Sequence, residues 1–132
     1  MRNPVATARA LQTIAKVATA VAEATPPFEV GFNRVLSFGG RTGNLPCVLR
    51  GSDDNTVLLE FHRRLGAMLA EQSFRSKGKP GFTPHVTLFY DEQRVAEEFV
   101  EPVSWKVNEF VLVHSLVGSS RYIPLARWTF QD

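Results

Sequence analysis

The sequence is poor in the residues that build disulfides and metal sites. It contains one cysteine, Cys47, and three histidines. A single cysteine excludes an internal disulfide and fits a reducing compartment. No spacing of histidine and cysteine typical of a metal site occurs. We therefore expect a cytoplasmic protein without bound metal or other cofactor.

Long hydrophobic runs and a strong charge of one sign are also missing. No apolar stretch approaches the ~18 residues of a membrane-spanning helix. The N-terminus lacks the basic head and continuous apolar run of a secretory signal. The formal net charge is only +2. This balance permits an anionic substrate but falls short of the basic surface of a dedicated nucleic-acid-binding protein.

The apolar residues that are present suffice for a packed core. Hydrophobic residues make up 44% of the chain and charged residues 21%, as in ordinary globular proteins. A length of 132 residues argues for a single domain, residues 1–132.

Periodic patterns predict both helices and strands. Asn3 and Pro4 suit the start of an amphipathic helix over about 4–24, and a second helical pattern covers about 54–74. Alternating apolar residues predict strands at about 28–38, 45–51, 84–90, 105–118 and 122–130. The pattern of residues 94–105 leaves that segment unassigned. The order of elements indicates an α+β fold, an antiparallel sheet covered by two main helices.

The stretch "FTPHVTLFYD", residues 82–91, carries a candidate site. Side chains of a strand alternate between its two faces, so one face is expected to carry His85, Thr87 and Phe89. The opposite face is expected to carry Val86, Leu88 and Tyr90, with Val86 and Leu88 in the core. A threonine hydroxyl can donate to a phosphate oxygen, and an imidazole exchanges protons near neutral pH. The preceding basic loop, with Lys77 and Lys79, would attract an anion.

Structural interpretations of the histidines and of the glycine-rich segment are also open. By spacing alone, His85 and Thr87 also fit an ordinary partly exposed strand. His62 is expected to be solvated or packed on its helix. His114 is expected at a structural or groove-edge position, with direct phosphate contact as the alternative, because Leu116 stands where a second motif would need threonine or serine. The glycine-rich "FGGRTGN" predicts a hairpin turn, with Arg41 at its tip as a possible phosphate contact.

The longer pattern is more specific than the spacing. "FTPHVTLFYD", "VLVHSLVG" and "RYIPLARW" together resemble the 2H phosphoesterase superfamily, and within it the bacterial 2'-5' RNA ligase / RNA 2',3'-cyclic phosphodiesterase family. The resemblance runs from about residue 4 onward. It implies a two-lobed fold with two facing His-x-Thr/Ser motifs, of which the second maps onto His85 and Thr87. We expect the chain to lack the N-terminal strand-helix-strand unit that holds the first.

The resemblance also implies a chemistry. One histidine activates water to attack the phosphorus, the other protonates the leaving ribose oxygen, and hydroxyls hold the phosphate without a metal. His85 and Thr87 would be catalytic. Further substrate-binding candidates are Tyr122, Arg121, Lys79 and Arg41. The implied partner is RNA or a nucleotide with a 2',3'-cyclic phosphate or a 2'-5' linkage, and no membrane.

Several functions stay open with one motif. The chain is expected to be an impaired enzyme of this class, or else a catalytically silent phosphate- or RNA-binding module. A third hypothesis is that the chain resembles the family only in its fold and does not share its function. Absence of the N-terminal unit would leave an open sheet edge, which favours a homo-oligomer.

Overall fold

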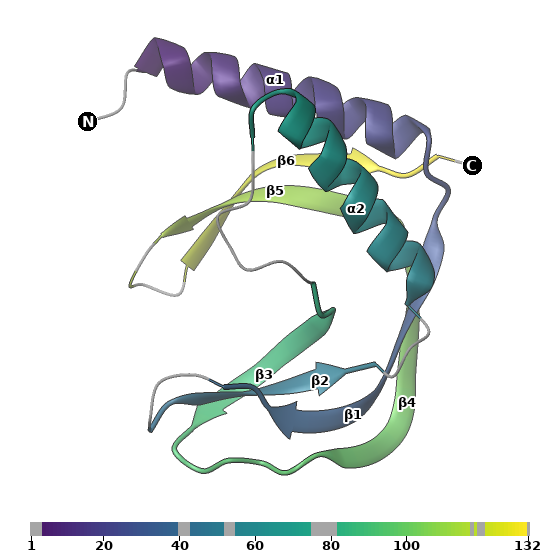
Figure 1. The fold of residues 1–132 in the computed structure, drawn as a ribbon, viewed down its shortest axis with the longest axis vertical. Coiled ribbons are helices and arrows are strands. Elements are labelled where there is room, and N and C mark those ends of the chain that lie inside the picture. The colour runs from purple at the N-terminus through teal and green to yellow at the C-terminus, as the bar shows by residue number, and fades with distance from the viewer. Residues whose placement is uncertain are drawn as a thin grey trace. The chain divides into compact units, whose positions relative to one another are not determined.

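The computed structural model describes residues 4–39, 43–51, 55–74, 82–116, 118 and 121–131. The elements follow in the order α1 (Pro4–Glu23), β1 (Phe28–Ser37), β2 (Leu45–Arg50), α2 (Thr56–Glu71), β3 (His85–Asp91), β4 (Glu98–Val107), β5 (Glu109–Leu116) and β6 (Arg121–Thr129) (Figure 1). The predicted α+β class with two main helices is confirmed. None of the helices formed by these residues is long and apolar enough to cross a membrane.

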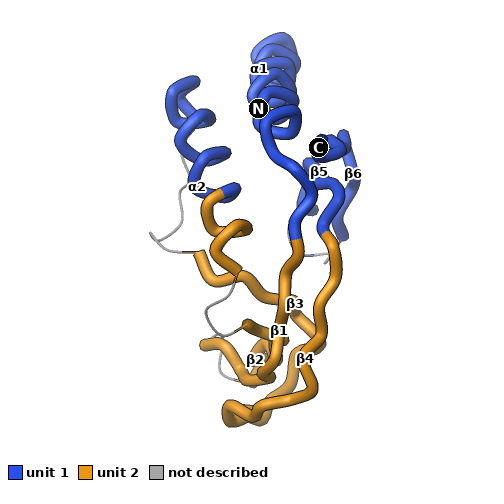
Figure 2. The backbone as a smooth tube through the Cα atoms, turned by 90° about the vertical axis from the view of Figure 1, so that its right-hand side faces the viewer, with its two compact units in different colours: residues 1–28, 61–77, 107–132 blue, residues 29–60, 78–106 orange. Residues whose placement is uncertain are grey.

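The chain divides into two compact units (Figure 2). The first contains residues 1–28, 61–77 and 107–132, and the second contains residues 29–60 and 78–106. Neither unit is continuous in sequence, and α2 contributes to both, residues 56–60 to the second unit and its remainder to the first.

The second unit is built on a four-stranded sheet in the order β3-β2-β1-β4. β2 runs antiparallel to both β1 and β3. Its core includes Val48, which is completely buried, and Phe32, whose ring stacks on Trp105 with centroids 5.2 Å apart. β3 and β4 form the two edges of the sheet among the described residues. Pro102 fits an edge position because proline lacks the N–H that a central strand donates.

The first unit packs α1 and the C-terminal part of α2 against the antiparallel pair β5-β6 (Figure 1). An aromatic cluster joins these elements through ring contacts of 5.0–6.1 Å between centroids, and its members are Phe28, Phe61, Phe110, Trp128 and Phe130. The indole of Trp128 also donates a hydrogen bond of 3.1 Å to Thr19 on α1. The amphipathic pattern of α1 is explained by this packing, which buries Val17 and Val21.

The prediction of one long strand over 105–118 is wrong. β4 ends at Val107 and β5 begins at Glu109, because the two strands belong to different sheets. The Asn108 carbonyl between them accepts a hydrogen bond of 2.8 Å from the N–H of Phe130. The segment 94–105, which the sequence pattern leaves unassigned, contains most of β4, so the fold has one more strand than predicted.

The predicted alternation along β3 is also wrong beyond Thr87. Thr87 pairs with Val48, but the next partner, Cys47, pairs with Phe89, so Leu88 is an extra residue in a β-bulge. An extra residue shifts the alternation, which places Phe89 on the face opposite to Thr87. Val86 and Leu88 were expected in the core, yet they are 38% and 48% exposed, because β3 is an edge strand.

Candidate functional site

His85 is the first residue of β3, and two contacts fix its ring. Its Nδ1 lies 2.7 Å from the carbonyl oxygen of Thr83. A carbonyl oxygen only accepts, so Nδ1 must carry the proton of this bond. The ring also meets Phe38 edge-on, with centroids 4.8 Å apart and planes at 65°. With Nδ1 engaged, Nε2 is the nitrogen left for a ligand, and the side chain is exposed.

The register of the sheet places a cation beside this histidine. His85 pairs with Arg50 and Thr87 pairs with Val48 on β2. Directly opposed residues of antiparallel strands share a face and have Cβ atoms about 4.5–5.5 Å apart. Arg50, His85 and Thr87 therefore lie on one face of the second unit. Arg50 is half-buried, and among the described residues its guanidinium has no hydrogen-bond or ion-pair partner.

The other arginine of this row is already engaged. Arg34 pairs with Arg50 on its far side. Its Nε and Nη2 donate to the carbonyl of Gly51 at 3.2 and 3.0 Å, and its Nη1 lies 2.9 Å from a carboxylate oxygen of Glu97. Arg34 therefore supports the loop after β2, whereas Arg50 remains available to an anion.

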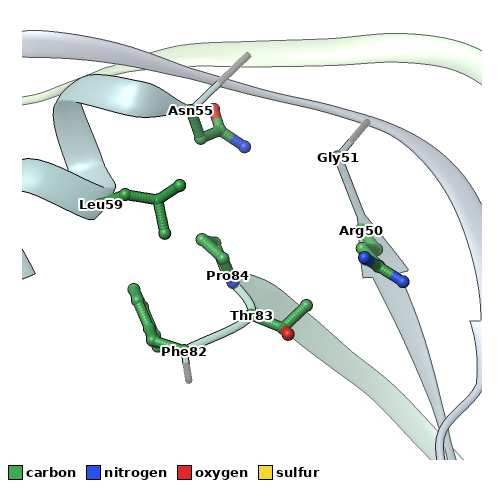
Figure 3. A pocket seen from close by; sticks show the side chains of 7 residues that line it. All are labelled: Arg50, Gly51, Asn55, Leu59, Phe82, Thr83 and Pro84. Atoms are coloured by element: carbon green, nitrogen blue, oxygen red, sulfur yellow. The ribbon is translucent and has the colours of Figure 1, made fainter. Parts of the chain in front are cut away.

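A pocket of ≈ 200 Å³ adjoins His85 within the second unit, and it is lined by Arg50, Gly51, Asn55, Leu59, Phe82, Thr83 and Pro84 (Figure 3). Asn55 holds its rim, because its side-chain amide accepts from the Gly31 N–H at 2.9 Å and donates to the Gly31 carbonyl at 3.0 Å. A Cβ on Gly51 would lie 2.6 Å from that carbonyl oxygen, so the close approach of Gly51 to strand β1 requires glycine here.

Two further predicted contacts belong to the first unit. Arg121 and Tyr122 lie at the start of β6 in the first unit, where they pair with Leu116 and Ser115. Neighbouring residues of a strand point to opposite faces, so only one of the two can face any given groove. Both side chains are exposed, Tyr122 by 65%.

Some predicted residues lie outside the described residues or outside this site. Lys77, Lys79 and Arg41 fall in segments that the structure does not describe. His62 is an exposed residue of α2, and His114 is an exposed residue of β5 that pairs with Ile123.

Sequence reasoning missed Arg50 and Phe38. Arg50 depends on the pairing of β2 with β3, which are separated by a helix and a long loop. Phe38 directly follows β1, and its N–H donates to the Pro46 carbonyl of β2, so its place beside His85 depends on two strand pairings. The available signal was the position of Arg50 at the end of a predicted strand, just before a glycine.

Two antiparallel sheets with two helices form the α+β architecture that the resemblance to 2H phosphoesterases implies. The family model described as the 2'-5' RNA ligase superfamily matches residues 1–118, and the chain belongs to this family.

Solved structures have the same fold. The structure of TT0787 of Thermus thermophilus matches with a TM-score of 0.67 and 21% identity over 98% of this chain and 73% of that one. E. coli LigT complexed with 3'-AMP matches with a TM-score of 0.64 and 20% identity over 95% and 71%. E. coli LigT complexed with NADP+ matches with a TM-score of 0.60 and 21% identity over 92% and 68%. A comparison with curated protein sequences gave no significant match.

Proposed function

We propose that the chain binds the phosphate of an RNA 2',3'-cyclic phosphate or 2'-5' phosphodiester at His85 and Thr87. The observation that carries this proposal is the fixed ring of His85, whose Nδ1 is held by the Thr83 carbonyl and whose Nε2 is left for a ligand. Thr87 stands two residues further on the same face and supplies a hydroxyl donor. Arg50 adds a positive charge beside both.

His85 would perform one of the two proton transfers in hydrolysis. Neutral Nε2 accepts a proton from the attacking water, or protonated Nε2 gives one to the leaving ribose oxygen as its bond to phosphorus breaks. In ligation the 5'-hydroxyl of a second RNA takes the place of water: it loses its proton to the general base and attacks the phosphorus, and the bond from phosphorus to the 3' ribose oxygen breaks as the general acid protonates that oxygen, which leaves a 2'-5' linkage. Family membership and the two LigT complexes with nucleotides support a nucleotide or RNA ligand.

The proposed activity of the 132-residue chain is low. Of its three histidines, only His85 is followed two residues later by threonine or serine. A general acid or base contributes typically about 10²–10⁴-fold to rate. A site with one histidine forgoes one such factor, together with the hold of a second hydroxyl on the phosphate.

Binding and turnover of 2',3'-cyclic AMP test the proposal together. We expect calorimetry to detect binding that His85→Ala and Thr87→Val weaken, while hydrolysis stays close to the uncatalysed rate. His62→Ala is a matched control, because that histidine lies on a helix, and it should leave binding intact. Rapid hydrolysis abolished by His85→Ala would instead establish a complete active site and contradict the low activity.

The alternative function is that of a catalytically silent phosphate- or RNA-binding module. It shares the site and differs only in turnover, so it is favoured if binding depends on His85 but the slow hydrolysis of the cyclic or 2'-5' compound is no faster than with His85→Ala. If neither His85→Ala nor Thr87→Val weakens binding, both proposed functions fail, and the likeness to the family is limited to the fold.

We also propose that a second copy of the chain pairs with the edge of β3. β3 ends the four-stranded sheet of the described residues, and edge strands expose unpaired backbone groups. Its side chains are apolar and exposed on both faces, with exposures of 38–60% at Val86, Leu88, Phe89 and Tyr90. Such a strand favours association.

A further inference from the structure

The Thr83 carbonyl that holds the ring of His85 lies just before β3. The register of β3 with β2 begins at His85, so strand pairing does not place this carbonyl. We propose that Pro84 is the positioning residue of the site, because its ring keeps the Thr83 carbonyl against Nδ1 of His85 and thereby sets the tautomer of the imidazole. The inference rests on the proposed function, since the tautomer matters when His85 meets a phosphate.

Few backbone torsions separate the carbonyl from the imidazole. Peptide bonds are planar, so the position of the Thr83 oxygen relative to the side chain of His85 depends on φ and ψ of Pro84 and on φ of His85. Pairing with Arg50 holds His85 in the extended backbone of the strand. The pyrrolidine ring locks φ of Pro84 at about −65°. Of these backbone torsions, ψ of Pro84 alone is left to other contacts.

The neighbours of Pro84 are themselves fixed to the sheet. Pro84 is half-buried and lines the pocket of ≈ 200 Å³ together with Leu59 of α2 and Phe82 (Figure 3). Asn55 ties the start of α2 to Gly31 of β1 by hydrogen bonds of 2.9 and 3.0 Å. The prolyl ring therefore lies in a pocket whose walls are anchored, which limits rotation about ψ.

A fixed carbonyl decides the tautomer of the neutral ring. The Thr83 oxygen lies 2.7 Å from Nδ1 and can only accept, so it favours the tautomer with the proton on Nδ1. The edge contact with Phe38 restrains the plane of the ring but does not distinguish its two nitrogens. Without the carbonyl the neutral ring would populate both tautomers, and in one of them Nε2 carries a proton and cannot accept another from water.

Pro84→Ala keeps the Thr83 carbonyl and frees φ. Side-chain nitrogen-15 NMR should find the proton of the neutral His85 ring on Nδ1 in the unmodified protein, and shifts between those of the two tautomers in Pro84→Ala. The dissociation constant of inorganic phosphate, measured by calorimetry, should rise about 2- to 5-fold, the scale on which one proline restricts a chain. Pro102→Ala, on β4 of the same unit, is the matched control and should change neither the tautomer nor the affinity.

The two proposals fail in different ways. Where His85→Ala weakens phosphate binding, an unchanged tautomer or an unchanged affinity in Pro84→Ala would overturn the role of Pro84. If His85→Ala leaves the affinity unchanged, the proposed phosphate site fails instead, and the tautomer alone then decides on Pro84. Pro84→Val covers the case in which Pro84→Ala does not fold, because valine favours extended backbone and fills more of the pocket, yet lacks the ring that locks φ. The same change of tautomer is expected from it.

Discussion

The imidazole of His85 is oriented by the chain itself before any ligand arrives. The Thr83 carbonyl holds Nδ1 and the Phe38 ring meets the imidazole edge-on. A histidine held in this way presents Nε2 in one direction, which reduces the entropy lost when a phosphate binds. A backbone carbonyl does this, so no side-chain substitution at Thr83 removes the acceptor itself.

This arrangement predicts the tautomer of His85. In the neutral ring the proton should reside on Nδ1 and Nε2 should be unprotonated, because the carbonyl accepts a hydrogen bond from Nδ1. Nitrogen-15 NMR of the side chain distinguishes the two nitrogens directly. A neutral His85 with its proton on Nε2 would show that the Thr83 contact does not hold the ring in solution.

At the scale of elements, the loop after β2 determines the shape of the pocket. Gly51 approaches Gly31 so closely that a Cβ would lie 2.6 Å from its carbonyl oxygen and 2.7 Å from the Asn55 amide nitrogen. The same carbonyl accepts from Asn55, which directly precedes α2. The start of the helix is thus tied to β1 through one crowded contact.

Gly51→Ala is therefore expected to destabilise the protein. Overpacking of a close contact costs typically about 1–3 kcal/mol of unfolding free energy. Gly66→Ala is the matched control, because nothing lies within 4 Å of its added Cβ and it is inside α2. That substitution should stabilise by roughly 0.5–1 kcal/mol. Chemical denaturation measures both changes, and equal stabilities of the two variants would contradict the crowding at Gly51.

The elements that local patterns predicted were those with one regular face. The helix of residues 4–24 corresponds to α1, and the strand predicted from Phe28 onward to β1, because apolar periodicity reports burial on one side. β4 has almost no buried residue, so it carried no such signal. The bulge at Leu88 depends on pairing with β2, which is a non-local contact. His85 and Thr87 were predicted as a site from their motif, whereas Arg50 needed the register.

At the scale of the whole molecule, the chain belongs to the 2'-5' RNA ligase superfamily. Its two compact units each combine segments that are distant in sequence. The expectation of a single domain stays a prediction. The residues proposed to bind the phosphate, Arg50, His85 and Thr87, all lie in the second unit.

The proposed pairing of two chains through the edge of β3 concerns the whole molecule. We expect light scattering at tens of micromolar to give a mass above that of one chain. Val86→Lys places a charge on the exposed edge, which should return the protein to a monomer, since lysine blocks strand pairing. A monomer in the unmodified protein would contradict this pairing, and an oligomer that persists in Val86→Lys would place the interface elsewhere.

The central claim is that His85 is the histidine that meets the phosphate. The chain has three histidines, so one NMR titration observes the candidate and two internal controls in the same sample. On addition of 2',3'-cyclic AMP, the account predicts that the ring signals of His85 shift in a saturable manner, while those of His62 and His114 stay in place. A shift of His62 or His114 with no change at His85 would contradict it.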